Sequence, residues 1–267
     1  MRKMMFQCAK TLLQKIPPKP LVILGYHRIR EDVCPGIDTI TTLKAHLELL
    51  SCLGYQFITV RHLVEGSTNG RRRMAVLTFD DGYQDFYYIV APLLRDYGVR
   101  ATVFVVSGYV DTQRIFKWIE QPELPLDWVM TSEQIRELHD EGFEIGSHTV
   151  THPQLTAINA IDVMNELVKS KSMLEEIIGD EVVSFCYPQG FYNRETIRLV
   201  QEAGYRAAVV SRFSMGVTYP WVPRNTAYDL ARIYPYSDLA GFRRQLGVGY
   251  ELFLYASYFW RNVVRKK

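Results

Sequence analysis

The stretch VLTFDDGYQDF, residues 76–86, carries an apolar run directly into two adjacent carboxylates, Asp80 and Asp81, and a glycine. The run before the pair is rich in residues that favour β structure, and an acidic pair followed by Gly82 is typical of a turn. We therefore predict a buried strand near 74–79 whose end presents two like charges. Such a pair is either an ordinary turn or part of a functional site, and the remaining motifs must distinguish the two.

Apolar runs of this length alternate with longer segments of helical period, which predicts β/α units around a largely parallel sheet or barrel. The predicted strands lie near residues 21–26, 55–59, 74–79, 101–106, 143–146, 182–187 and 206–210. The predicted helices cover residues 42–53, 85–97, 131–141, 159–178, 193–203 and about 238–246. Thr131 and Gln134 fit a capping box at the start of one of these helices. The proline-containing segments 119–128 and 216–225 are predicted to be loops.

Composition and charge narrow the class of protein. A chain of 267 residues suffices for one sizeable α/β domain. The 31 Lys and Arg nearly balance the 29 Asp and Glu, for a formal charge of +2, which argues against a nucleic acid partner. The cysteines show no metal-ligand spacing, so we expect reduced thiols at Cys8, Cys34, Cys52 and Cys186.

A second motif, FEIGSHTVTHPQL (143–155), presents His148 and His152 directly after another predicted strand. Gly146 and Pro153 argue against one helix through both residues, so we expect a loop that carries the two imidazoles. Loop histidines in isolation are more often bonded to backbone than to a ligand. Two imidazoles together with a carboxylate, however, form the usual shell of a catalytic divalent metal, and the acidic pair supplies that carboxylate.

TFDDG (78–82) and SHTVTH (147–152) together resemble the first two motifs of the polysaccharide deacetylase family, the NodB-homology domain of carbohydrate esterase family 4. Further similarity is to its poly-N-acetylglucosamine deacetylase branch, in which the motif order is circularly permuted. The stretches that carry it are LGYHRIRED (24–32), YQFITVRHL (55–63), ATVFV (101–105) and MTSEQIRELHDEGFEIGSHT (130–149). The resemblance covers residues 20–235 and implies a distorted (β/α) barrel of about seven parallel strands.

The resemblance also implies roles for the paired carboxylates. Asp80 would be the general base, and Asp81, His148 and His152 would bind a divalent metal. Zinc suits these ligands best, with cobalt, nickel, manganese and iron as alternatives. Successive side chains on a strand point to opposite sides, so the two carboxylates can diverge. A metal on Asp81 would stabilise ionised Asp80 and lower the pKa of a water whose proton Asp80 accepts.

The third family motif, usually Arg-x-Pro-Tyr-Gly, reads CYPQG (186–190) here. Cys186 stands where Arg, which orients the catalytic base, is common, and we expect its thiol to be inert. A backbone N–H survives the change of Tyr to Gln, so Gln189 is the expected oxyanion donor. Its neighbours Tyr187 and Pro188 are expected to contact the substrate.

Two positions are proposed to replace missing family residues. The family usually supplies a catalytic His late in the domain, but no His follows His152. In the permuted branch the general acid lies on the first strand, where His27 of ILGYHRI matches it; the alternative is a structural His at a strand end. Arg224, after YPWVP, is either a substitute for the lost base-orienting Arg or part of a surface ion pair.

The chain is expected to comprise an N-terminal amphipathic extension (1–19), a catalytic domain (20–235) and a C-terminal helical extension (236–267). We predict neither a signal peptide nor a transmembrane helix, and hence a cytoplasmic protein. The end YELFLYASYFWRNVVRKK (250–267) is aromatic and basic. The two extensions either pack on the barrel or lie on an anionic membrane surface as peripheral contacts.

The expected function is a metal-dependent hydrolase that removes N-acetyl groups from the amino sugars of a polysaccharide or a lipid-linked glycan. An N-acetylated carbohydrate is the expected substrate, and no obligate protein partner is evident. The alternative is a catalytically weakened glycan-binding protein on the same fold, prompted by the loss of the motif Arg. Loop aromatics that could stack on sugar rings are Phe116, Trp118, Trp128, Phe191, Tyr192, Tyr219 and Trp221.

Overall fold

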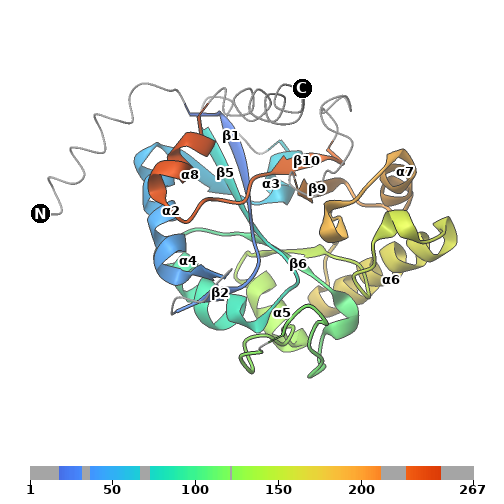
Figure 1. The fold of residues 1–267 in the computed structure, drawn as a ribbon. Coiled ribbons are helices and arrows are strands. Elements are labelled where there is room, and N and C mark those ends of the chain that lie inside the picture. The colour runs from blue at the N-terminus through green and yellow to red at the C-terminus, as the bar shows by residue number, and fades with distance from the viewer. Residues whose placement is uncertain (1–17, 32–36, 67–72, 121, 212–226, 248–267) are drawn as a thin grey trace, which may run out of the picture.

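Seven parallel strands form a nearly closed barrel in the computed structural model, which describes residues 18–31, 37–66, 73–120, 122–211 and 227–247 (Figure 1). The ring runs β1, β5, β6, β7, β8, β9, β10. The strands are β1 Leu21–Tyr26, β5 Arg73–Phe79, β6 Thr102–Val105, β7 Glu144–Ser147, β8 Ser184–Cys186, β9 Ala207–Ser211 and β10 Leu230–Arg232. A parallel bridge between Leu24 and Ile233 joins β10 back to β1 and closes the ring.

The prediction of about seven parallel strands is confirmed, but one member of the ring differs. β4 (Tyr55–Ile58), which was predicted as a strand, pairs with Arg73–Val76 of β5 and lies outside the ring. The last two residues of β5 pair with β6 instead. The seventh ring strand is β10, which the sequence did not predict. Its three residues end in Arg232 and contain no apolar run long enough to indicate a strand. Two short strands, β2 Ile29–Arg30 and β3 Asp38–Thr39, pair separately.

The helices lie outside the barrel, and all but one are in places that the helical periodicity predicted (Figure 1). They are α2 Ile40–Cys52, α3 Val60–Val64, α4 Ala91–Asp96, α5 Ser132–Asp140, α6 Ala160–Ile178, α7 Arg194–Glu202 and α8 Leu239–Gln245. Short 3₁₀ turns are η2 Ser107–Tyr109, η3 Leu155–Ala157 and η4 Pro188–Gly190. The capping box at Thr131 and Gln134 is present at the start of α5. The short α3, capped by Thr59, was not predicted.

The segment predicted as one helix over 85–97 consists of a π-helical turn, η1 Phe86–Val90, followed by α4. Pro92 lies in the first turn of α4 and has no N–H to donate to the preceding turn. The missing α-helical bond favours a wider turn at this point. The predicted loop 119–128 has no helix or strand in its described part, whereas all of 216–225 lies outside the described residues.

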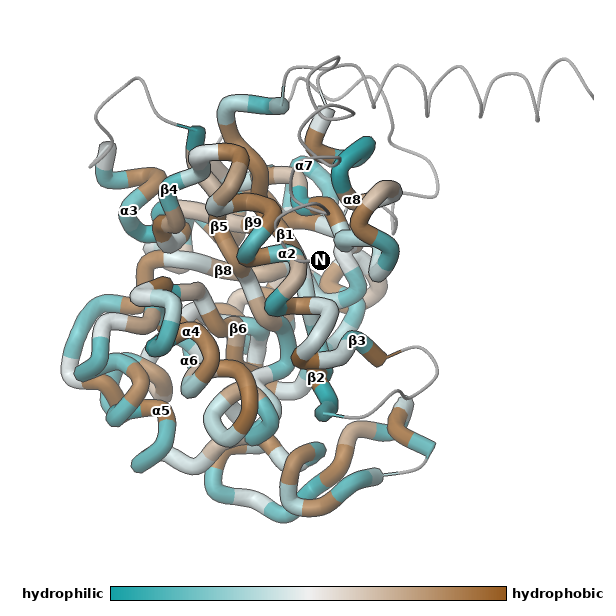
Figure 2. Tube along the Cα trace, turned by 90° about the vertical axis from the view of Figure 1, so that its left-hand side faces the viewer, coloured by the Kyte–Doolittle hydropathy of each residue, from teal (hydrophilic) through white to brown (hydrophobic). Residues whose placement is uncertain are grey.

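Two clusters of buried apolar residues form the core of the barrel. Figure 2 shows hydrophobic strand residues, in brown, in the middle of the molecule. A small cluster that includes Ile23, Val76, Phe104, Cys186 and Val209 takes alternate positions on its strands. A larger cluster packs between the strands and the helices. Because the strands are buried on both faces, they read as continuous apolar runs in the sequence.

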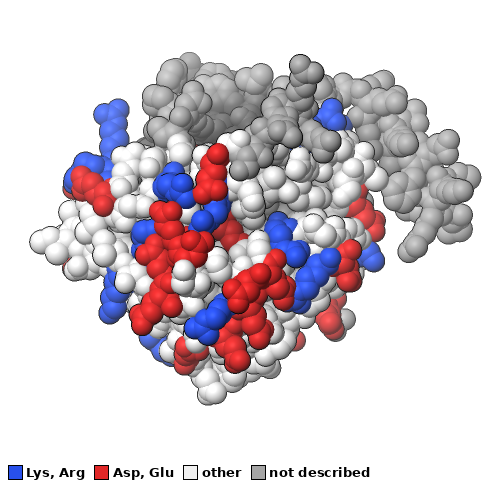
Figure 3. All heavy atoms as spheres, turned by 180° about the vertical axis from the view of Figure 1, so that it is seen from behind, with Lys and Arg blue, Asp and Glu red and all other residues white. Residues whose placement is uncertain are grey.

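Charged side chains of both signs share the face of the molecule that is opposite to the view of Figure 1. Figure 3 shows acidic and basic side chains interspersed over the face seen from behind, in keeping with the formal charge of +2. Among the described residues, no helix has the length and apolar character needed to cross a membrane. The predicted thiols Cys52 and Cys186 are free, whereas Cys8 and Cys34 lie outside the described residues.

The predicted extensions fall largely outside the described part of the chain. The exception is α8, which packs beside α2. Phe242 of α8 is fully buried against the ring of His46, and Gln245 accepts a hydrogen bond from the backbone of Tyr236. The first part of the predicted C-terminal extension is therefore packed on the barrel.

Candidate active site

A pocket of about 700 Å³ opens where the carboxyl ends of the barrel strands meet. Every strand of the ring, or the loop that follows it, contributes to its wall. The lining residues are His27, Asp80, Asp81, Trp118, His148, His152, Tyr187, Gln189, Gly190, Ser211, Arg232 and Tyr234. Since loops at this end of a β/α barrel commonly carry function, the pocket is the natural candidate site.

The two adjacent carboxylates at the end of β5 diverge and face different partners. The Asp80 N–H donates to Tyr26 O at 3.0 Å, whereas Asp81 and Gly82 adopt left-handed conformations with φ of 71° and 75°. The turn sends Asp80 toward Arg232 and Asp81 toward the two loop histidines. Both carboxylates are buried, so neither is an ordinary solvated turn residue.

Asp80 forms a bidentate ion pair with Arg232, which lies at the end of β10. Arg232 Nη1 and Nη2 donate to the two carboxylate oxygens at 2.6 and 2.7 Å, and Nη1 also donates to Thr78 Oγ1 at 3.0 Å. Burial alone raises the pKa of Asp80, but the charge of Arg232 outweighs it and holds the pKa of this carboxyl well below its usual range. Asp80 is therefore ionised at neutral pH.

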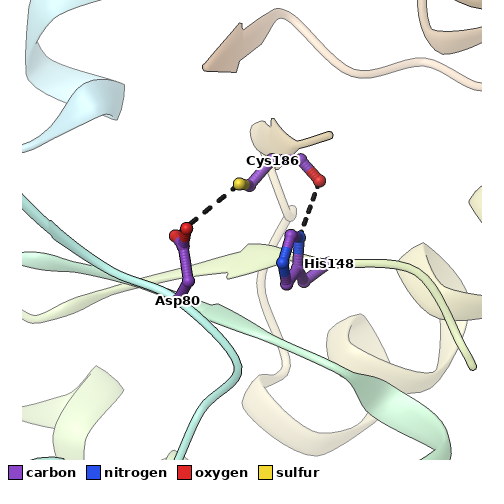
Figure 4. A group of neighbouring side chains, drawn as sticks. All are labelled: Asp80, His148 and Cys186. Carbon is purple, nitrogen blue, oxygen red and sulfur yellow. Dashed lines mark hydrogen bonds between the residues drawn. The ribbon is translucent and has the colours of Figure 1, made fainter. Parts of the chain in front are cut away.

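Arg232 was missed by sequence reasoning, which considered Arg224; that residue lies outside the described part of the chain. The only sequence signal for Arg232 is an arginine next to short apolar residues in DLARIYPY. Its guanidinium lies 3.1 Å from the Cys186 sulfur, and that sulfur lies 3.6 Å from Asp80 (Figure 4). The small side chain at position 186 thus leaves room for an arginine from another strand.

Asp81, His148 and His152 form a second cluster. Nε2 of each imidazole lies 3.7 Å from Asp81 Oδ1. His148 Nδ1 bonds to Cys186 O at 2.8 Å (Figure 4), and because a carbonyl only accepts, that nitrogen carries the proton and Nε2 keeps its lone pair. Burial lowers the pKa of His148 to about 3 and also lowers that of His152, so both rings are neutral.

The cluster fits a divalent cation. Its three ligand atoms lie within 4.8 Å of one another, and two neutral imidazoles with one carboxylate are typical zinc ligands. The bond from His148 to the Cys186 carbonyl is the kind of outer contact that orients a metal-bound histidine. Asp80, His148 and Cys186 are equally close together, but Arg232 already neutralises Asp80, and burial raises the pKa of the Cys186 thiol, which stays protonated.

The loop that carries the histidines has two non-glycine residues with positive φ, Thr149 at 67° and His152 at 61°. Such a backbone costs free energy and persists only where other contacts hold it. Glu166 of α6 supplies them: it accepts the N–H groups of Val150 and Thr151 at 2.7 and 2.9 Å, and the Thr151 hydroxyl at 2.7 Å. Sequence reasoning missed Glu166, which is one of several acidic residues on an amphipathic helix.

His27 follows β1 and stands on the other side of Asp80. Its Nε2 lies 3.7 Å from Asp80 Oδ2, and its ring stacks on Tyr234 with centroids 5.5 Å apart. The side chain is 49% exposed, so it faces the open part of the pocket. Gly25 allows this arrangement, because a Cβ there would lie 2.9 Å from the Tyr234 ring.

A buried ion-pair cluster holds the segment that follows His27. Arg30 donates to Asp85 at 2.7 Å and also to Asp127, while Arg28 donates to Asp127 at 3.3 Å. The N–H of Ile29 donates to Asp85 at 2.7 Å. These contacts tie the end of β1 to η1 and to the loop before α5.

The predicted CYPQG turn lies beside the pocket. Gln189 lines it with a left-handed backbone, φ 57°, and Tyr187 lines it while its hydroxyl donates to Tyr228 O at 3.1 Å. Pro188 is buried within η4 and is not among the lining residues described.

Seven aromatic residues were candidates for stacking on a sugar. Among the five that the structure describes, only Trp118 lines the pocket. Phe116 is buried behind it, and the ring of Tyr192 lies 5.3 Å from the ring of Tyr187 at a tilt of 31°. Phe191 is exposed outside the lining, and Trp128 is partly buried. Tyr219 and Trp221 lie outside the described residues.

Comparison with known proteins agrees with this geometry. The sequence profile described as polysaccharide deacetylase matches residues 67–208. A putative polysaccharide deacetylase of Bacillus subtilis, YxkH, is 27% identical over 73% of this chain and 65% of its own length. The peptidoglycan-N-acetylmuramic acid deacetylase PdaA of the same organism is 27% identical over 52% of this chain and 46% of its own length. The chain thus spans less than two thirds of these curated relatives.

Solved structures share the fold. The Streptococcus pyogenes deacetylase PplD superposes with a TM-score of 0.68 at 22% identity, over 86% of this chain and 99% of that one. IcaB from Ammonifex degensii superposes with a TM-score of 0.66 at 20% identity, over 84% and 96%. At these identities the likeness establishes the barrel fold.

Proposed function

This chain belongs to the polysaccharide deacetylase family, and from that premise we propose that it is a metal-dependent hydrolase that removes N-acetyl groups from amino sugars. The observation that carries the proposal is the separation of the paired carboxylates. Asp80 is ionised and oriented by Arg232, while Asp81 faces His148 and His152. One carboxylate is thereby available for proton transfer and the other for a cation.

Asp81, His148 and His152 would hold the metal, with zinc best suited to this ligand set. When bound, the cation would lower the pKa of the attacking water and polarise the acetamide carbonyl. The buried, neutral state of both imidazoles supports this assignment, since a protonated imidazole cannot bind a metal.

The remaining chemistry falls to the chain's own groups. Asp80 would accept a proton from the water as its oxygen bonds to the carbonyl carbon, which makes it the general base. His27, 3.7 Å from Asp80, would donate a proton from Nε2 to the leaving amine as the C–N bond breaks. The N–H of Gln189, in a tight turn on the pocket wall, would stabilise the oxyanion, with Tyr187 and Pro188 shaping that turn.

The substrate class follows from the relatives, whose names refer to acetylated peptidoglycan and other glycans. We propose an N-acetylated polysaccharide or lipid-linked glycan. Contact of residues 1–19 and 250–267 with an anionic membrane is part of the lipid-linked proposal. Flotation of the full chain with anionic liposomes, compared with a variant lacking 250–267, tests it; equal recovery of both with the soluble fraction contradicts it.

The alternative, a weakened glycan-binding protein, was prompted by Cys186 in place of an arginine. Arg232 removes that reason, because it donates both bonds that orient Asp80. The buried ion pair between Asp80 and Arg232, beside an exposed His27, supports the hydrolase over the binding protein.

Acetate release from a panel of N-acetylated oligosaccharides and lipid-linked sugars, with and without chelator, tests the proposal. We expect chelator-sensitive release that Asp80→Asn abolishes without loss of bound metal, and that His27→Gln reduces by about 100-fold or more. Turnover that a chelator leaves unchanged would contradict the metal's role. Binding of the same glycans without acetate release would favour the alternative.

A further inference from the structure

Tyr234 contacts two side chains that have roles in the proposed chemistry. It follows the end of β10 by two residues and lines the pocket together with His27 and Arg232. The rings of Tyr234 and His27 stack, with centroids 5.5 Å apart and an interplanar angle of 19°. The Tyr234 hydroxyl accepts a hydrogen bond from Arg232 Nη2 at 3.3 Å. One side chain therefore touches both the proposed proton donor and the arginine that orients Asp80.

The imidazole of His27 has few other restraints. Its side chain is 49% exposed, and its Nε2 lies 3.7 Å from Asp80 Oδ2, which is too long for a hydrogen bond. Arg28 and Arg30 form ion pairs that hold the neighbouring backbone, but these contacts leave the side-chain torsions of His27 free. The stack on Tyr234 is therefore the contact that selects one orientation of the imidazole.

Tyr234 is itself held in place. Gln245 of α8 is buried, and its Nε2 donates to Tyr234 O at 2.9 Å. The ring lies so close to Gly25 that a Cβ at this glycine would be 2.9 Å from it. The hydroxyl bonds to the guanidinium of Arg232, which two bonds to Asp80 already fix. An aromatic ring with these restraints offers a rigid surface on which a second ring can stack.

We propose that Tyr234 is a positioning residue for His27. Its ring holds the imidazole where Nε2 can donate a proton to the leaving amine, and its bond to Arg232 ties the proton donor to the group that orients the base. This inference rests on the proposed function, because it concerns the same hydrolysis. Misplacement of a catalytic group by about 1 Å can lower a rate by on the order of 100-fold, so the loss of the stack has a measurable effect.

The leaving group distinguishes the loss of a proton donor from a general loss of structure. An amine needs a proton in order to leave, whereas the phenolate of 4-nitrophenyl acetate leaves without one. We expect Tyr234→Leu to lower kcat for an N-acetylated chitooligosaccharide by about 10- to 50-fold, with KM little changed, and kcat for the ester by less than about twofold. His27→Gln should show the same selectivity with a larger loss. Equal losses on both substrates would overturn the proposal.

Further variants test whether the two side chains act together. When Tyr234→Leu is added to His27→Gln, kcat should fall no further, because the group to be positioned is already absent. Tyr234→Phe keeps the stack and loses only the bond to Arg232, so we expect kcat to fall by less than about threefold. The matched control is Tyr236→Leu, which should keep full activity: Tyr236 is 42% exposed and is not among the lining residues described. Additive losses in the double variant would contradict the positioning role.

Nuclear magnetic resonance of protein with labelled histidine tests the stack without catalysis. The ring current of a stacked tyrosine displaces the resonances of the protons beside it. The His27 ring signals, assigned by their absence in His27→Gln, should therefore move in Tyr234→Leu and stay nearly in place in Tyr234→Phe. Unchanged His27 signals in Tyr234→Leu, with its fold verified by circular dichroism, would overturn the proposal.

The outcomes separate this inference from the proposed function. A shift of the His27 signals in Tyr234→Leu supports the positioning of the imidazole even if no glycan releases acetate, in which case the deacetylase proposal alone fails. Conversely, acetate release by the unaltered protein together with undiminished kcat in Tyr234→Leu would leave the deacetylase and remove the role of Tyr234.

Discussion

Arg232 donates two hydrogen bonds to Asp80 across 152 positions of sequence, at 2.6 and 2.7 Å. The pair is possible because the barrel closes: β10 joins β1, and β1 joins β5, so the two strand ends are near neighbours. Both side chains are buried, and a bidentate guanidinium–carboxylate pair fixes orientation as well as charge. The strand that completes the ring, β10, thus carries the residue that orients the proposed base.

Replacing Arg232 by Gln should lower kcat by about 100-fold or more, because Asp80 loses its orientation and its charge partner. Without the guanidinium, burial raises the pKa of Asp80, so the acidic limb of the pH–rate profile should move to higher pH. The free energy of unfolding should fall by about 3–5 kcal/mol, the cost of breaking a buried ion pair.

A second-site change distinguishes the positioning role from a merely structural one. In Arg232→Ser combined with Cys186→Arg, the new arginine on β8 supplies the guanidinium. The Cys186 sulfur that it replaces lies 3.6 Å from Asp80. We expect part of the lost activity and of the pH shift to be restored. An unchanged pH profile in Arg232→Gln would contradict the role assigned to this residue.

The sequence predicted the pocket's acidic and histidine residues because they form local motifs. Asp80 and Asp81 follow a readable strand, and His148 and His152 follow another, so the convergence of strand ends brings them together. Arg232 could not be predicted, since β10 has three residues and its partner is remote. Because Arg232 was not foreseen, Cys186 was interpreted as the loss of the arginine that orients the catalytic base.

Glu166 escaped prediction for a related reason. Neither residue type nor spacing distinguishes Glu166 from the other acidic residues of α6, and its role exists only because the helix passes behind the 148–152 loop.

Glu166→Ala should weaken metal binding by about tenfold, because the strained loop that carries His148 and His152 loses three hydrogen bonds. Calorimetric titration with Zn²⁺ gives the affinity. Glu175→Ala is a matched control on the same helix: Glu175 also accepts a backbone N–H, from Val182 at 3.0 Å, but away from the pocket. We expect both variants to lose stability and only Glu166→Ala to lose metal affinity; equal affinities would contradict the role of Glu166.

Gly25→Ala should reduce kcat by about tenfold while leaving Zn²⁺ affinity unchanged. The new Cβ would lie 2.9 Å from the Tyr234 ring, which must shift and take the stacked His27 with it. Overpacking of this kind costs about 1–3 kcal/mol of stability. Gly98→Ala is the control: it carries backbone strain at φ 64° with open space around it, so it should cost stability without loss of activity. Full activity in Gly25→Ala would mean that His27 does not depend on Tyr234.

The stability of the metal-free protein should fall with acidification between about pH 6.5 and pH 4, in part through His46. This residue is fully buried, and burial lowers its pKa to about 4. Its Nε2 donates to Tyr236 O at 3.0 Å, so Nδ1 must accept from the Tyr26 hydroxyl, also at 3.0 Å, and protonation would break that bond. Between these pH values the unfolded chain binds a proton that the folded chain excludes, so the free energy of unfolding rises with pH there, by up to about 3 kcal/mol in all.

Urea unfolding at several pH values, with chelator present, measures this contribution of His46. The other buried imidazoles, His148 and His152, also have lowered pKa values and add to the slope. Comparison with His46→Gln removes their share, because they remain in both proteins. The variant should be less stable at pH 7 and should lose less stability on acidification. Parallel curves for the two proteins would show that His46 already titrates normally in the fold, and would contradict the assignment of its neutral, hydrogen-bonded form.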